Sequence, residues 1–100
     1  FHYGVDLEAE EGEIIHSFAD GTVGVVARSS QLGNYLTVNH PGGFSTLYAH
    51  CRCVTASAGQ TVRCGDVLAE VGQTGVATGP HLHFELYHDQ VYINPIYYVA

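Results

Sequence analysis

Residues 81–87 read His-Leu-His-Phe-Glu-Leu-Tyr, a strict alternation of polar and apolar side chains. A period of two is typical of a β-strand that buries one face. The apolar face would carry Leu82, Phe84 and Leu86, and the polar face would carry His81, His83 and Glu85. The stretch therefore predicts a half-buried strand that brings two imidazoles and a carboxylate to one side of a sheet.

The rest of the chain repeats this strand pattern. Apolar, β-branched and aromatic stretches are separated by glycine-rich turns, and no segment has a convincing helical period. Further strands are expected at 14–18, 22–28, 35–39, 44–50, 67–71 and 91–93. Short strands with frequent turns favour an all-β fold, an antiparallel sheet folded into a sandwich or a partly open barrel. The acidic run Glu8 to Glu13 is expected to be a solvated loop.

The spacing of the histidines in 81–87 suits a metal. Two residues apart on a strand, the Cα atoms of His81 and His83 lie roughly 7 Å apart, so their rings can converge on one small site. Histidine is the commonest metal ligand but also an ordinary surface residue, so the pair alone leaves a plain polar strand face open. Glu85 would either orient a ligand ring or serve as a cross-strand polar partner.

A second candidate lies in His-Tyr-Gly-Val-Asp at residues 2–6. Fully extended, this stretch would hold the Cα atoms of His2 and Asp6 about 13 Å apart. Both can ligate one metal only if the chain bends between them, and Gly4 is placed to allow a bend. By itself the pair is also consistent with a His and an Asp that meet near a turn by chance. With His83 it forms a set of two imidazoles and one carboxylate, which leaves a zinc position open for water.

A third segment, residues 44–50, ends at His50. Alone, this histidine would be an ordinary residue at a strand end. Beside a metal site, His50 and His81 are the imidazoles not used as ligands, and zinc lowers the pKa of a bound water to about 7, which suits a histidine base. Tyr48 lies two residues before His50, hence on the same strand face, where it would either donate to a substrate carbonyl or simply occupy a strand.

Together these segments resemble the lysostaphin-type (LytM-like) peptidoglycan metalloendopeptidases. The resemblance covers HYGVD, GNYLTVNH, TLYAH, GQTVRCGDVLAEVGQTG, TGPHLHFEL and the closing Asn94-Pro95. It implies Zn²⁺ ligands at His2, Asp6 and His83. It also implies that His50 and His81 are catalytic, activating water and stabilising the tetrahedral intermediate, without deciding which of them is the base.

The resemblance further implies an endopeptidase that hydrolyses peptide stems or cross-bridges of bacterial peptidoglycan, outside the cytoplasm, in the cell envelope or secreted. The alternative is a non-catalytic LytM-like module that recruits or activates another cell-wall hydrolase. Loss of ligands would mark such a module, and all five positions are intact. Residues 1–100 are expected to be one LytM-like peptidase domain from a larger protein, with an upstream strand or loop missing.

Composition excludes several other functions. A formal net charge of −7 and three scattered arginines argue against nucleic-acid binding. No apolar run approaches the ~20 residues that span a membrane. AGQTVRCGDVLAEVG resembles the hammerhead of lipoyl and biotinyl carrier domains, but the chain has no lysine to carry a cofactor, so only a related barrel-sandwich topology is expected. The oligomeric state stays open.

Three cysteines do not have zinc-finger spacing. Cys53 and Cys64 bracket a stretch that reads as a hairpin, which would place them opposite each other for a disulfide. Cys51 would then remain a single thiol, most simply a small core residue.

Overall fold

The computed structural model describes residues 4–93, and nearly all of its regular structure is β. The strands are β1 (Val5–Glu8), β2 (Ile14–His16), β3 (Gly21–Ser29), β4 (Gly33–Asn39), β5 (Phe44–Val54), β6 (Thr61–Val62), β7 (Val67–Val71), β8 (His81–His88) and β9 (Val91–Ile93), with a 3-10 turn at Pro41–Gly43. No helix within these residues is long and apolar enough to cross a membrane.

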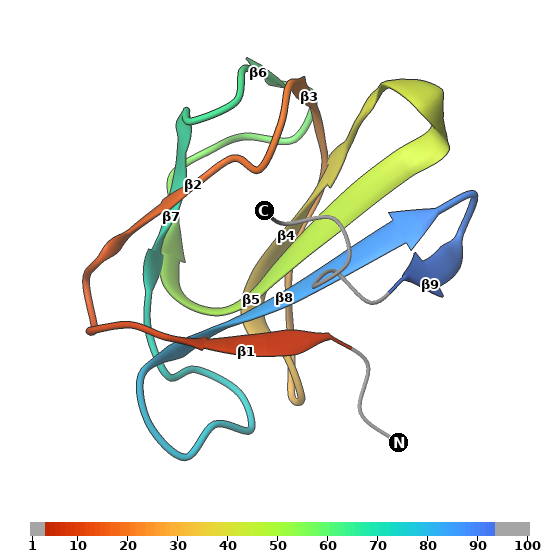
Figure 1. Cartoon of the computed structure of the whole chain (residues 1–100). Coiled ribbons are helices and arrows are strands. Elements are labelled where there is room, and N and C mark those ends of the chain that lie inside the picture. Colours follow the sequence, from red (N-terminus) through yellow and green to blue (C-terminus); the bar gives the residue numbers. More distant parts are fainter. Residues whose placement is uncertain (1–3, 94–100) are drawn as a thin grey trace.

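Every strand pair is antiparallel, and the main order is β1-β8-β5-β4-β3-β6. β9 pairs with β8, and β7 pairs with both β2 and β5. Figure 1 shows β4, β5 and β8 running side by side, with β2 and β7 together at the side of the sheet that β5 reaches after it bends. The sheet folds over without closing into a barrel, as the sequence predicts.

The bend in β5 gives the sheet its shape. Residues 44–49 of β5 pair with β8, and residues 51–54 pair with β7. One strand thus joins both parts of the sheet, and the core lies between them. Its most buried large side chains include Tyr48, Leu36, Leu68, Leu86 and Val23.

The two faces of β8 follow the predicted alternation. Phe84 and Leu86 are buried in the core, and Leu82 packs against it. The opposite face is not exposed, since His83 is 5% and Glu85 8% accessible. The turn before β1 covers them, because Gly4 approaches both side chains closely. β8 is therefore buried on both faces at its middle, where a half-buried strand was expected.

Two short strands were not predicted. β1 begins in the HYGVD stretch and ends at Glu8, so the first residue of the predicted acidic loop belongs to a strand. β6 has only two residues and pairs with β3. Strands this short carry little periodicity, and pairing with a neighbouring strand rather than local pattern determines them.

The predicted hairpin between Cys53 and Cys64 is wrong. The end of β5 pairs with β7, whereas β6 pairs with β3, so the two cysteines are not partners across a ladder. Cys64 instead donates its backbone N–H to Asp20 Oδ1 over 2.7 Å. All three cysteines are free thiols, and Cys51 is fully buried as expected for a small core residue.

Thiol labelling should separate these cysteines. Burial raises the pKa of the Cys51 thiol to about 12, so at pH 8 only roughly one in 10,000 Cys51 side chains is the reactive thiolate. With a small thiol reagent and peptide mapping by mass spectrometry, exposed Cys64 should label quickly and Cys51 only after unfolding. Equal labelling of Cys51 and Cys64 in the folded protein would contradict this packing.

Candidate functional site

Three adjacent strands bring four of the five predicted site residues together. β8 supplies His81 and His83, β1 supplies Asp6, and His50 comes from β5. The register places Asp6 opposite His83 on one side of β8. Asp6 Oδ1 lies 2.8 Å from His83 Nδ1 and 3.7 Å from His81 Nε2. His2 lies outside the described residues.

His50 reaches this group from an unusual backbone position. Its φ is +62°, a left-handed conformation that non-glycine residues seldom adopt and that the surrounding structure must hold. Its ring centroid is 4.9 Å from that of His81 and 5.9 Å from that of His83. The three imidazoles therefore surround one small space, with the Asp6 carboxylate beside two of them.

Backbone carbonyls determine the tautomer of two of these rings. His50 Nδ1 lies 2.7 Å from the Thr74 carbonyl oxygen, and His81 Nδ1 lies 2.9 Å from that of Gly79. Because a carbonyl only accepts, each Nδ1 must carry the proton, and each neutral ring keeps a bare Nε2. Burial lowers the pKa of His50, which favours that neutral form. Two imidazoles are thus prepared as proton acceptors.

The two ring nitrogens of His83 have side-chain carboxylates as partners instead of a backbone carbonyl. Its Nε2 lies 2.7 Å from Glu85 Oε2, while Nδ1 faces Asp6. The Glu85 carboxylate, more than Asp6, raises the pKa of His83 against the effect of burial. Tyr87 in turn donates its hydroxyl proton to Glu85 Oε1. When the ring is neutral, an Nε2–H donated to Glu85 leaves the Nδ1 lone pair directed at the Asp6 side, as in ligand histidines oriented by a carboxylate.

These contacts fit one of the two roles considered for Glu85. It is buried against a candidate ligand ring and does not act as a cross-strand partner on an exposed face.

The His83 nitrogen and the Asp6 carboxylate oxygen that face each other are a normal zinc donor pair. Among residues 4–93 no group of three or more His, Cys, Asp or Glu is arranged to hold a metal ion. A complete set would need the third predicted ligand, His2.

Gly4 makes the close approach of Asp6 to β8 possible. Its φ is +110°, and a Cβ there would lie 2.7 Å from the Phe84 carbonyl oxygen and 2.8 Å from His83 Cε1. Its N–H donates to the Tyr92 hydroxyl over 2.8 Å. The predicted bend at Gly4 is present, and no other residue fits this position without displacing the backbone.

The expectation that Tyr48 shares the face of His50 is wrong. Tyr48 is buried in the core, where its hydroxyl accepts the Phe18 N–H over 3.0 Å. The alternation fails because β5 contains an extra residue between the two: Tyr48 pairs with Leu36 and Cys51 with Asn34, so Ala49 and His50 lie opposite Tyr35 alone. Such a β-bulge re-aims a side chain, and here it directs His50 to the site.

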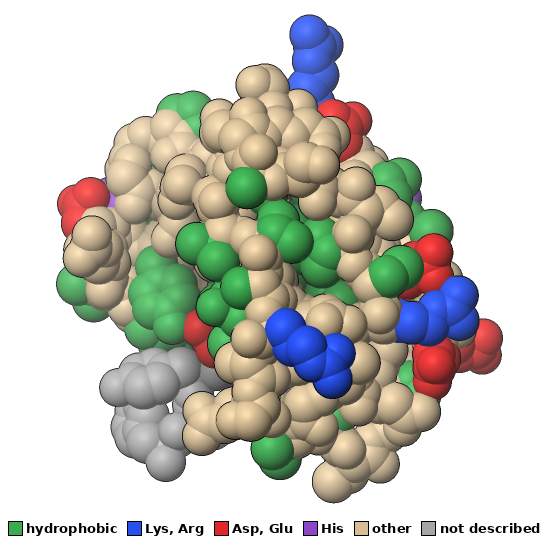
Figure 2. Space-filling model, turned by 180° about the vertical axis from the view of Figure 1, so that it is seen from behind, with side chains coloured by type: hydrophobic (Ala, Val, Ile, Leu, Met, Phe, Trp, Pro, Cys, Tyr) green, Lys and Arg blue, Asp and Glu red, His purple; other side chains and the backbone are tan. Residues whose placement is uncertain are grey.

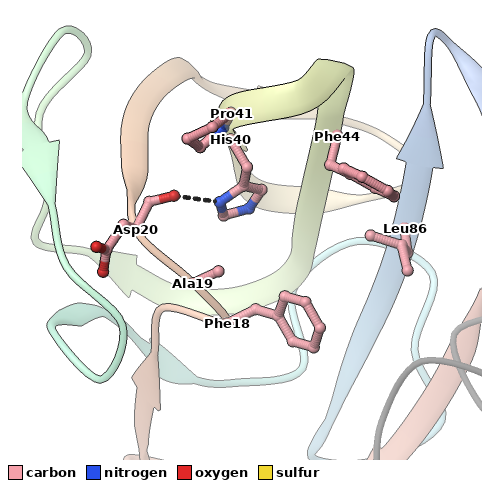
Figure 3. A pocket seen from close by; sticks show the side chains of 7 residues that line it. All are labelled: Phe18, Ala19, Asp20, His40, Pro41, Phe44 and Leu86. Atoms are coloured by element: carbon pink, nitrogen blue, oxygen red, sulfur yellow. Dashed lines mark hydrogen bonds between the residues drawn. The ribbon is translucent and has the colours of Figure 1, made fainter.

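An apolar hollow of about 340 Å³ lies elsewhere, between the loop that follows β2 and the ends of β5 and β8. Its lining is Phe18, Ala19, Asp20, His40, Pro41, Phe44 and Leu86 (Figure 3). The His40 ring lines the hollow and donates its Nδ1–H to the Asp20 carbonyl over 2.7 Å. Leu86 belongs to the core face of β8, so this hollow is not part of the histidine site.

The carbonyls of Thr74 and Gly79, which orient His50 and His81, were not predicted. They belong to the backbone of the loop between β7 and β8, so side-chain identity carries no signal for them. Thr74 contributes its hydroxyl as well, which donates to the Cys51 carbonyl over 2.7 Å.

Comparison with known proteins agrees with this arrangement. The sequence model of the family described as Peptidase family M23 matches residues 1–95 of the chain. Peptidoglycan DD-endopeptidase ShyB of Vibrio cholerae is 40% identical over 85 residues, which are 85% of this chain and 20% of the relative. The DD-carboxypeptidase/endopeptidase Mpg of Neisseria meningitidis is 38% identical over 95 residues, which are 95% of this chain and only 22% of the relative, so the chain spans a small part of such relatives' length.

Many solved structures share the fold, and two illustrate it. A zinc-containing peptidase from Vibrio cholerae superposes with a TM-score of 0.87 at 37% identity, covering 90% of this chain and 28% of that one. The catalytic domain of lysostaphin from Staphylococcus simulans gives 0.90 at 25% identity, covering 97% and 77%. The all-β fold with an acidic residue and histidines on adjacent strands is that of a metallopeptidase domain. The chain belongs to peptidase family M23.

Gly4 offers a test of the close approach over His83. Gly4→Ala should lower the free energy of unfolding by more than the roughly 1–2 kcal/mol of a left-handed alanine alone, because the new Cβ meets backbone. Gly59→Ala is the matched control, since Gly59 also has a positive φ (+85°), but a Cβ there would have no atom within 4 Å. Urea unfolding of both variants gives the comparison, and equal losses would refute the contact.

Proposed function

We propose that this chain is a catalytically competent zinc endopeptidase domain that hydrolyses peptide stems or cross-bridges of bacterial peptidoglycan. The observation that carries the proposal is the pair of bare Nε2 atoms on His50 and His81 beside the facing Asp6 and His83. A site that only held a metal would have no need of two further imidazoles with oriented lone pairs. The name of the relative ShyB supports the substrate class.

The zinc ligands in this proposal are His2, Asp6 and His83. Asp6 and His83 already present an oxygen and a nitrogen to each other over 2.8 Å, and His2 precedes the bend at Gly4 that returns the chain to β8. When bound, zinc supplies Lewis-acid polarisation of the scissile carbonyl and acidifies water at its open position. Glu85 holds the His83 ring through Nε2.

His50 and His81 handle the protons. Each neutral ring can accept a proton from the attacking water only at Nε2, because Nδ1 is bonded to a carbonyl. After it accepts that proton, the same atom becomes a donor toward the developing oxyanion or the leaving amine. Both rings have the same tautomer, which supports a proton-transfer role for each and leaves the choice of base between them open.

The wider setting follows from the substrate. Peptidoglycan lies outside the cytoplasmic membrane, so we place the domain in the cell envelope, either periplasmic or secreted. We also propose that residues 1–100 act as one peptidase domain of a longer protein. Nucleic acid is not a partner in this proposal, and Figure 2 shows the basic side chains of one face lying apart from one another.

Zinc content and wall digestion test the proposal together. Purified protein should contain one equivalent of zinc and release soluble peptide-linked fragments from peptidoglycan, and a chelator should stop the release. Mass spectrometry of the fragments then identifies the bond cleaved. Bound zinc with no release from walls of several cross-link types would overturn the catalytic assignment and favour the non-catalytic module.

Single substitutions should separate ligands from proton carriers. His83→Ala should lose both zinc and turnover, because it removes a ligand. His50→Ala and His81→Ala should keep zinc and lose kcat by about 10²–10⁴-fold, the usual contribution of a general acid or base.

His16→Ala is the matched control for these variants. His16 is exposed on β2, and its Nδ1 also bonds a carbonyl, that of Gly65, over 2.9 Å. It should behave as wild type in zinc content and rate. A His50 variant that kept the normal rate would remove His50 from the proposed mechanism.

A further inference from the structure

The β-bulge that directs His50 to the site interrupts the hydrogen-bond ladder between β4 and β5. Between the pairs Leu36–Tyr48 and Asn34–Cys51, two residues of β5 face one of β4. At the same place β5 changes partner from β8 to β7, and His50 takes its left-handed conformation. A bulge interrupts the ladder, so nearby carbonyls need other donors.

Two side chains supply those donors. The Thr74 hydroxyl donates to the Cys51 carbonyl over 2.7 Å, and Asn34 Nδ2 reaches the carbonyls of Cys51 and Arg52 over 3.2 and 3.1 Å. The Asn34 N–H in turn donates to Thr74 Oγ1 over 3.1 Å. Thr74 and Asn34 thus bond to each other and to the two residues that follow His50.

Thr74 also contacts the ring that the bulge presents. Its carbonyl oxygen accepts the His50 Nδ1–H, while the His50 N–H donates to the Leu32 carbonyl over 2.8 Å. One residue therefore binds the bulge through its side chain and the imidazole through its backbone. Any displacement of Thr74 moves the acceptor that determines the tautomer of His50.

The Thr74 loop has no room to shift toward the β3–β4 turn. A Cβ on Gly33 would lie 2.3 Å from Thr74 Oγ1, and one on Gly75 would lie 2.3 Å from the Gly33 nitrogen. The Val76 N–H donates to the Gln31 carbonyl over 3.0 Å. Glycine at both positions lets two loops from distant parts of the chain pack backbone to backbone.

We propose that Thr74 and Asn34 are positioning residues that hold His50 in its bulged conformation with the proton on Nδ1 and Nε2 directed into the site. Neither needs to touch the substrate. The inference rests on the proposed peptidase function for its kinetic consequence, whereas its structural consequence, the tautomer of His50, can be measured without activity.

The test compares zinc-loaded wild type with Thr74→Val and Thr74→Ser. Valine keeps the shape of threonine but removes the hydroxyl, so we expect kcat to fall about 10- to 100-fold with little change in KM or zinc content, as for a misplaced catalytic group. Serine keeps the hydroxyl and should restore kcat to within about threefold. Thr61→Val, on the exposed position of β6, is the matched control and should behave as wild type.

Long-range proton–nitrogen NMR of the histidine rings gives the direct readout. His50 should be a single Nδ1–H tautomer in wild type and Thr74→Ser, and a mixture in Thr74→Val. If Thr74→Val does not fold, Asn34→Ala takes its place, with the same shift in tautomer expected. An unchanged His50 tautomer in the folded variant would overturn the proposal. Inactive, zinc-loaded wild type would instead count against the peptidase function alone.

Discussion

The pairing of β5 with β8 is the constraint on which the rest of the site depends. It places Tyr48 opposite Phe84 in the core and Ala49 opposite His83 at the site. Because side chains alternate with a period of two, a slip of one residue would bring the core face of one strand beside the site face of the other. Asp6 and His50 are positioned relative to this pair, one through β1 and the other through the bulge that follows Ala49.

Polar side chains buried at the centre of a sheet need hydrogen-bond partners. His83 and Glu85 bond to each other along β8, and His83 also contacts Asp6 while Glu85 accepts the Tyr87 hydroxyl. The strand alternation alone gives each of these groups a direction. The turn at Gly4 then covers His83 and Glu85, so the contact between these two groups lies in a less polar environment, whereas Asp6 stays half exposed.

The sequence was informative where local pattern determines structure. The alternation in residues 81–87 correctly predicted which side chains share each face of β8, although not that the polar face is buried. The bend at Gly4 was predicted because His2 and Asp6 could share one metal only if the chain turned between them. Prediction failed where pairing between distant strands decides. Counting two residues from His50 to Tyr48 gave the wrong face, because a bulge changes parity without any mark in the sequence. The supposed hairpin between Cys53 and Cys64 failed because β6 pairs with β3. Backbone acceptors such as the carbonyls of Thr74 and Gly79 were missed for another reason, because side-chain identity carries no signal for them.

The contact between Asp6 and His83 spans 77 positions of the chain, and this separation has a consequence for biogenesis. A ribosome that makes the chain from its N-terminus releases Asp6 long before His83 exists, and closing so long a loop has an entropic cost that only the finished sheet offsets. The two groups can therefore meet only after β8 has been synthesised. A nascent chain that ends before β8 therefore lacks the assembled site.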